Sequence, residues 1–311
     1  MLKRTLLFLS NRKGLFHFAQ RNALARRFAS RFVAGETIDT ALAAVRSLNQ
    51  HHISASLDLL GESVSNAAEA KHTAEVYVEL LDCIAAEGLD ANVSVKLTAL
   101  GQDIAPDVCL SNIRAVLDHA KQRGNFVRLD MEGSAYTERT LDLFKTQLYG
   151  SYPNTVGVVL QSYLRRTAGD VERAIGLQCR VRLCKGAYKE PAAIAFPKKS
   201  DVDANYAACM KRLMTDGRYP GLATHDETMI AEARRYASEH GLAADRFEFQ
   251  MLYGVRRDLQ QKLVQLGHRV RVYVPFGTQW YPYLMRRLAE RPANIAFMVG
   301  NIAKEMLRST R

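Results

Sequence analysis

The sequence predicts an α/β protein: a (β/α)8 TIM-type barrel preceded by an N-terminal helical arm. Beyond residue 53, short runs of β-branched and apolar residues alternate with segments of helical periodicity, such as PDVCLSNIRAVLDHAKQRG. Eight strand–helix units joined by right-handed crossovers are typical of a closed barrel. A doubly wound open sheet is the alternative, which the absence of a GxGxxG or GxxxxGK loop after a strand disfavours.

The strands of the barrel can be assigned in chain order. The eight expected strands lie at about 54–60, 92–98, 126–131, 156–161, 180–184, 221–225, 247–252 and 269–274. A chain of 311 residues could hold two domains, but α/β barrels commonly use this length as one domain. We therefore expect a basic arm at residues 1–52 and one barrel at residues 53–311, which carries the functional site.

Positive charge is concentrated in the arm. Residues 1–35 contain eight Lys or Arg and no acidic residue, in a chain of net charge +11. Leu24, Phe28 and Phe32 recur at i, i+4 and i+8, which predicts an amphipathic helix. Such a helix lies on an anionic membrane surface, binds nucleic acid, or packs on the domain with its arginines solvated. Polar residues interrupt the apolar stretch LLFLS, which disfavours a signal peptide but leaves an organellar transit segment open.

Composition excludes other classes of protein. No run of about 18 apolar residues is present, so a membrane-spanning helix is not expected. The five cysteines form an odd number without CxxC spacing, which is typical of reduced thiols in the cytoplasm and predicts no metal site. A nucleic-acid-binding protein would interleave aromatic and cationic residues on one surface, whereas the cations outside the arm lie at strand ends. No nucleic-acid partner is therefore expected.

Polar side chains follow nearly every expected strand. In a barrel the carboxyl ends of the strands meet at one mouth, where active sites lie. The polar residues at these ends are Glu62, Lys96, Asp130, Glu132, Gln161, Arg182, Lys185, His225, Gln250 and Tyr273. Each alone has a structural explanation, but together they predict a ring of mixed charge at the mouth. In RVRLCKGAY, three cations occupy nine positions of a buried strand, and burying unpaired cations is costly enough that an anion is expected beside them.

The last expected helix adds a second cluster. In QWYPYLMRRLAE, Tyr283, Arg286, Arg287 and Glu290 recur at i, i+3, i+4 and i+7 and so share one face. Adjacent arginines offer planar groups that bind a carboxylate or phosphate. A solvated basic helix face is the alternative.

These runs resemble a known family. LDLLGES, SVKLTAL, RLDMEG, VLQSY, VRLCKGAY, ATHD, EFQMLYG and VYVPFGTQWYPYLMRRLAE are similar, in the same order, to the motifs of proline dehydrogenase, the flavin-dependent enzyme of proline catabolism. The resemblance covers most of residues 30–300. Since no length remains for an aldehyde dehydrogenase domain, the chain resembles the monofunctional bacterial form and the corresponding domain of the bifunctional proline utilization A proteins.

The resemblance implies an activity and its partners. It implies oxidation of L-proline to 1-pyrroline-5-carboxylate by hydride transfer from C5 to N5 of non-covalent FAD, with electrons passed to a membrane quinone. Peripheral contact with the inner face of the cell membrane would then suit the basic arm. The remaining alternative is another flavin-dependent barrel oxidoreductase, such as a methylenetetrahydrofolate reductase-like enzyme, which would not need paired arginines on the closing helix.

The resemblance also implies roles for single residues. Arg182 and Asp130 match the catalytic positions, and Glu62 matches a gate that pairs with Arg286. The residues that match cofactor contacts are Gln161, Arg182, Lys185, Ala187, Thr224, His225 and Glu290. The residues that match substrate contacts are Lys96, Arg286, Arg287, Tyr273 and Tyr283. The acceptor of the amine proton stays open between Asp130 and solvent.

Overall fold

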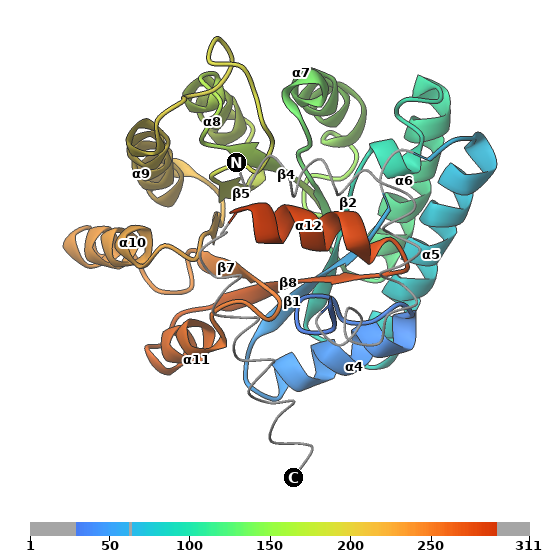
Figure 1. Cartoon of the computed structure of the whole chain (residues 1–311), viewed down its shortest axis with the longest axis horizontal. Helices are drawn as coiled ribbons and strands as arrows, with labels where there is room; N and C mark the ends of the chain where they lie inside the picture. Colours follow the sequence, from blue (N-terminus) through green and yellow to red (C-terminus); the bar gives the residue numbers. More distant parts are fainter. Residues whose placement is uncertain (1–28, 62–63, 291–311) are drawn as a thin grey trace.

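The structure is a computed structural model in which residues 29–61 and 64–290 are described, with only the backbone described at Arg286 and residues 288–290. Eight parallel strands pair in chain order, and the last pairs with the first to close a barrel (Figure 1). The strands are β1 (Ser54–Leu59), β2 (Ala91–Val95), β3 (Val127–Leu129), β4 (Val156–Gln161), β5 (Arg180–Cys184), β6 (Gly221–Ala223), β7 (Glu248–Leu252) and β8 (Val270–Phe276). The predicted (β/α)8 fold and all eight strands are confirmed.

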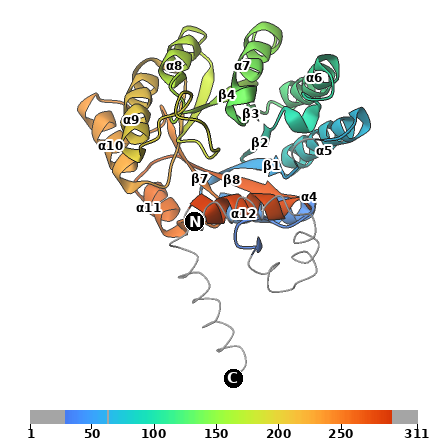
Figure 2. The ribbon, with the colours of Figure 1, turned by 45° about the horizontal axis from the view of Figure 1, so that its top comes forward.

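Helices surround the barrel, as Figure 2 shows. They are α4 (Ile38–Asn49), α5 (Ala67–Ala86), α6 (Pro106–Gln122), α7 (Ser134–Leu143), α8 (Thr167–Gly176), α9 (Lys199–Asp216), α10 (Glu227–Glu239), α11 (Arg257–Gln265) and α12 (Trp280–Glu290), with the short η1 (Thr98–Leu100) and η2 (Phe144–Leu148). Local sequence sets several starts: Thr37 forms a capping box for α4, and Pro106 begins α6. None of the described helices is both long and apolar enough to cross a membrane.

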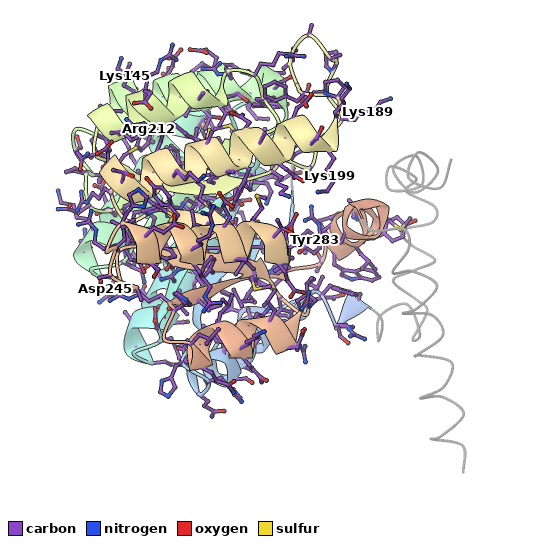
Figure 3. The ribbon with its side chains drawn as sticks, turned by 90° about the vertical axis from the view of Figure 1, so that its left-hand side faces the viewer. Lys145, Lys189, Lys199, Arg212, Asp245 and Tyr283 are labelled. Atoms are coloured by element: carbon purple, nitrogen blue, oxygen red, sulfur yellow. The ribbon has the colours of Figure 1, made fainter. Side chains whose placement is uncertain are left out.

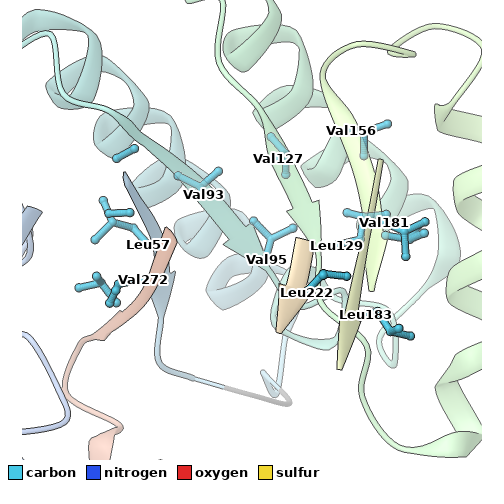
Figure 4. Packing of buried hydrophobic residues seen from close by; sticks show 14 of the residues in the cluster. Leu57, Val93, Val95, Val127, Leu129, Val156, Val181, Leu183, Leu222 and Val272 are labelled. Atoms are coloured by element: carbon cyan, nitrogen blue, oxygen red, sulfur yellow. The ribbon is translucent and has the colours of Figure 1, made fainter. Parts of the chain in front are cut away.

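Successive side chains of a strand point alternately outward and into the barrel, and the outward ones are apolar whereas many of the inward ones are polar. In β5, Val181 and Leu183 are buried under the surrounding helices, whereas Arg182 points into the barrel and contacts residues of other strands. Figure 4 shows these apolar residues packed together with others such as Leu57 and Val95. Fully burying each such side chain contributes about 1.5–3 kcal/mol. The apolar layer outside the strands therefore stabilises a barrel whose interior holds charges.

The segment before the barrel packs against its last helix. Phe32 and Val33 form a buried cluster with Trp280 and Leu284 of α12, and the Trp280 indole donates to Glu36 Oε1 at 3.0 Å. α12 crosses the end of the barrel where the strands finish, on the side of β1 and β8 (Figures 1 and 2). Residues 1–28 of the predicted arm lie outside the described residues. Of the rest of that arm, α4 packs against β1 and β8.

Candidate active site

Arg182 occupies the centre of the barrel, where β5 positions it. Its Nη1 donates to Asp130 Oδ1 at 2.8 Å and to Ser94 Oγ at 3.0 Å, and its Nη2 donates to Ser56 Oγ at 3.2 Å. The guanidinium is buried. Three strands therefore hold this cation, and the structure brings together the two residues that match catalytic positions.

Asp130 accepts hydrogen bonds from three sides. Besides Arg182, Ser94 Oγ donates to Oδ1 at 2.8 Å, and Tyr273 OH donates to Oδ2 at 2.7 Å. Burial and the nearby Asp130 charge raise the pKa of Tyr273, so its hydroxyl remains a donor. Asp130 is therefore the shared acceptor of Arg182, Ser94 and Tyr273.

Lys96, a predicted substrate contact, is paired inside the barrel. Its Nζ lies 2.7 and 2.9 Å from the two oxygens of Asp58, 3.5 Å from Tyr273 OH and 4.0 Å from Asp130 Oδ2. Asp58 is completely buried, and this burial raises the pKa of its carboxyl to about 6 although Lys96 opposes the shift. Sequence reasoning missed Asp58. The alternation of Ser54, Ser56 and Asp58 in SASLDLL could have revealed it, because those residues share the face that points inward.

Gln161 and His225, two predicted cofactor contacts, end or follow the strands on either side of β5. Gln161 ends β4 and is buried; its Nε2 donates to Met131 O at 3.3 Å, and its Oε1 has no hydrogen-bond partner among the described residues. His225 follows β6, and its Nε2 accepts the Leu252 N–H at 2.9 Å. Since Nε2 is the acceptor, Nδ1 carries the proton in the neutral ring. Thr224, the residue before it, is buried at the end of the same strand.

Lys185 is bound by two carboxylates that sequence reasoning missed. Its Nζ donates to Asp203 Oδ1 at 2.5 Å and to Asp226 Oδ2 at 2.7 Å, and Lys199 contacts the same two residues. Burial opposes ionisation of both carboxyls, but the hydrogen bonds and charge of Lys185, together with Lys199, outweigh it and the pKa of each is lowered. Asp203 lies on α9 and Asp226 caps α10, so two neighbouring helices meet at this cation.

The loop after β5 packs closely against the ring of Tyr163. Gly186 has φ of 106°, and an added Cβ would lie 2.2 Å from the ring of Tyr163. Only glycine fits there without displacing the ring. The same loop contains Ala187, a predicted cofactor contact. The tight turn at Gly186 keeps the backbone of Ala187 near the end of β5.

The closing helix carries the second predicted cluster. Tyr283 is buried, and the guanidinium of Arg287 lies over its ring, 5.3 Å from the centroid. Figure 3 shows Tyr283 at the same end of the barrel as Lys189 and Lys199, opposite Asp245. The side chains of Arg286 and Glu290 lie outside the described residues, although both belong to α12. Glu62 also lies outside them, so the predicted gate stays a prediction.

Fold and site together define a class of protein: a (β/α)8 barrel enzyme with a charged centre at the carboxyl ends of its strands, covered by a helix. The family model for proline dehydrogenase matches residues 41–299. The chain is 42% identical over 305 residues to proline dehydrogenase 1 of Bacillus subtilis strain 168, covering 98% of this chain and 100% of that protein. The proline dehydrogenase of Deinococcus radiodurans is 42% identical over 303 residues, covering 94% and 98%.

The chain therefore belongs to the proline dehydrogenase family, and the predicted resemblance and enzyme class are confirmed. Solved structures agree. Proline utilization A from Bdellovibrio bacteriovorus, inactivated by N-propargylglycine, superimposes with a TM-score of 0.81 at 28% identity over 90% of this chain. A variant of the protein from Bradyrhizobium japonicum gives a TM-score of 0.74 at 25% identity over 87%. This chain spans about a third of each of those longer chains, 34% and 31%.

Proposed function

We propose that the chain oxidises L-proline to 1-pyrroline-5-carboxylate with non-covalent FAD bound at the mouth of the barrel. The observation that carries this proposal is that Asp130 accepts hydrogen bonds from both Arg182 and Tyr273 inside the barrel of a chain that belongs to this family. When bound, FAD supplies N5 as the hydride acceptor, and negative charge on the reduced ring would be stabilised by Arg182.

The residues present fit a flavin. Gln161 Oε1 is a buried acceptor without a partner among the described residues, and the pyrimidine edge of a flavin offers an N–H donor. Arg182 offers a fixed cation next to it on β5. We infer that these two residues hold the ring. Lys185, Ala187, Thr224 and His225 then line the path to the pyrophosphate, with Glu290 near the adenosine.

The substrate would bind between the barrel centre and α12. Lys96, Arg286 and Arg287 are the proposed partners of the proline carboxylate, and Tyr273 and Tyr283 the proposed walls. Asp58 pairs with Lys96, so a carboxylate that approaches this ammonium competes with a buried acidic side chain. Arg286 and Arg287 therefore supply most of the attraction, and Glu62 pairs with Arg286 to close the site.

The amine must lose a proton before it can form the imine. Asp130 and solvent remain the two candidate acceptors. The three donors on Asp130 compete with the amine for the lone pairs of its carboxyl oxygens. The electrons then pass to a membrane quinone, and the basic arm brings the protein to the inner face of the cell membrane, where it stays peripheral.

A dye-linked assay with L-proline tests substrate and cofactor together. We expect purified protein to be yellow and to reduce the dye when proline is added, and acid precipitation to release all of the flavin. Colourless protein that cannot be reconstituted with FAD would overturn the cofactor assignment. Flavin that remains in the pellet would overturn its non-covalent attachment.

A further inference from the structure

Arg182 is held from the interior of the barrel by a chain of polar residues. Its Nε donates to Gln250 Oε1, and Gln250 Nε2 donates to Glu248 Oε1 at 2.5 Å. Glu248 in turn accepts from Arg271 Nε at 2.9 Å and from Tyr219 OH at 3.0 Å. Gln250 and Glu248 are two residues apart on β7, so both point into the barrel. Both are buried.

The two neighbours of Gln250 fix the direction of its amide. A guanidinium Nε only donates and an ionised carboxylate only accepts, so the amide oxygen faces Arg182 and the amide NH2 faces Glu248. Burial opposes ionisation of Glu248, but the charge and hydrogen bond of Arg271 outweigh it and lower its pKa to about 2. The Glu248 carboxylate therefore stays ionised near neutral pH, and it keeps the Gln250 amide in this one orientation.

The neighbouring strand leaves room for this amide. Gly221 of β6 lies beside it, and an added Cβ would sit 2.3 Å from Gln250 Nε2 and 2.8 Å from its Cδ. A side chain at this position would push the amide away from both partners. The absence of a side chain at residue 221 is an observation independent of the hydrogen bonds, and it indicates the same placement of Gln250.

Four hydrogen bonds use most of the donors of Arg182. A guanidinium has five N–H groups. Among the described residues, Gln250 takes the one on Nε, Ser94 and Asp130 take the two on Nη1, and Ser56 takes one on Nη2. One Nη2 donor remains, and the plane of the group is fixed. Gln250 is neutral, so it orients the cation without adding a second carboxyl group to the one that Asp130 already supplies.

We propose that Gln250, oriented by Glu248, is a positioning residue that fixes Arg182 toward the flavin and adds no further negative charge beside it. This inference rests on the proposed role of Arg182 beside the flavin. The chain of hydrogen bonds from Arg182 through Gln250 and Glu248 reaches Arg271, which lies near the amino end of β8.

The test measures the midpoint potential of the bound flavin together with dye-linked proline kinetics. Gln250→Met keeps the volume but removes both hydrogen bonds, and Gly221→Ala displaces the amide without removing a polar group. Asn112→Leu is the matched control, because it removes a buried amide that lies outside the barrel and donates to Leu100 O, its one hydrogen-bond partner among the residues that the structure describes. For the two test variants we expect kcat to fall about tenfold with KM for proline within twofold. The reduced flavin should be held about tenfold less tightly relative to the oxidised form, a shift of about 30 mV to lower potential.

The outcomes separate this inference from the proposed function. Wild-type protein without flavin or proline oxidation would defeat the proposed function whatever Gln250 does. An active wild type together with a Gln250→Met variant of unchanged potential and kcat would overturn only the positioning role. If that variant does not fold, Gly221→Ala decides by the same measurements. A loss of kcat with an unchanged potential, shared by the control, would mean that these residues only stabilise the fold.

Discussion

Asp58 accepts both short hydrogen bonds from the Lys96 ammonium, 2.7 and 2.9 Å from its two oxygens, while lying completely buried at the end of β1. Burial raises the pKa of Asp58 from 3.8 to about 6 in the folded protein even though Lys96 opposes the shift. The folded state therefore binds a proton more tightly than the unfolded state at this position.

This pair predicts a pH dependence of stability. For a carboxyl with a raised pKa, the stabilising contribution is present below about pH 4 and is lost as pH rises through about 6. We expect the wild-type free energy of unfolding to lose about 3 kcal/mol from this group across that window. The Asp58→Asn variant should lack that slope when urea unfolding is measured at several pH values. Identical slopes in the two proteins would show that Asp58 titrates normally.

Tyr77 supports the same strand from outside the barrel. Its hydroxyl accepts the Leu59 N–H at 3.1 Å and donates to Ser94 O at 2.9 Å, so it joins β1 to β2. Tyr77→Phe leaves the half-buried Leu59 N–H and the buried Ser94 carbonyl without this partner, and we expect a loss of about 1–3 kcal/mol in the free energy of unfolding. Flavin content should be unchanged in the folded fraction. Urea midpoints equal within error to those of the wild type would contradict the bridge.

The barrel was predictable from sequence, whereas the pairing inside it was not. Alternation in runs such as RVRLC identifies the strands and the inward face. It does not say that Arg182 meets Gln250, 68 residues further along, or that Lys96 meets Asp58, because these contacts depend on barrel closure. Lys185 was expected beside a cofactor anion, and its two aspartates come from helices whose rotation no local pattern fixes.

Lys185 and Lys199 form a matched pair for testing cofactor binding. Both contact Asp203 and Asp226, but the Lys185 side chain is 24% exposed and that of Lys199 is 76% exposed. Lys185→Met would leave two carboxylates turned toward the proposed pyrophosphate site, and we expect FAD affinity to fall tenfold or more. Lys199→Met should stay within twofold. Equal affinities in both variants, measured by flavin titration of apoprotein, would remove Lys185 from the cofactor site.

We predict that the basic residues at the start of the chain bind an anionic membrane surface. Each cation contributes about 1 kcal/mol near an anionic surface, and Lys and Arg are concentrated in the first residues of the chain. Since Ala29 already packs in the cluster beneath α12, the cut belongs before it. Deleting residues 1–28 should reduce binding to vesicles that contain anionic lipid and leave dye-linked activity near wild type. If vesicle binding persists at the wild-type level, the arm has a packing role only.

Arg286 and Arg287 give the sharpest test of where the substrate binds. Proline offers one group that suits a planar cation, its carboxylate, and Arg287 is already stacked on Tyr283 at the closing helix. Replacing either arginine by Met keeps the aliphatic stem but leaves the carboxylate underpaired, which typically costs about 2–5 kcal/mol. At about 1.4 kcal/mol per tenfold, kcat/KM for proline should fall roughly 30-fold or more.

Lysine should not rescue either position, since a point charge does not reproduce the two parallel hydrogen bonds of a guanidinium. Flavin content and visible spectrum should stay near wild type in both Met variants, because these residues are proposed to bind the substrate rather than the redox edge of the cofactor. Proline kinetics and flavin occupancy measured on the same preparations separate the two roles. Near-normal kcat/KM in both variants would make the arginine pair a solvated helix face and would move the substrate site away from α12.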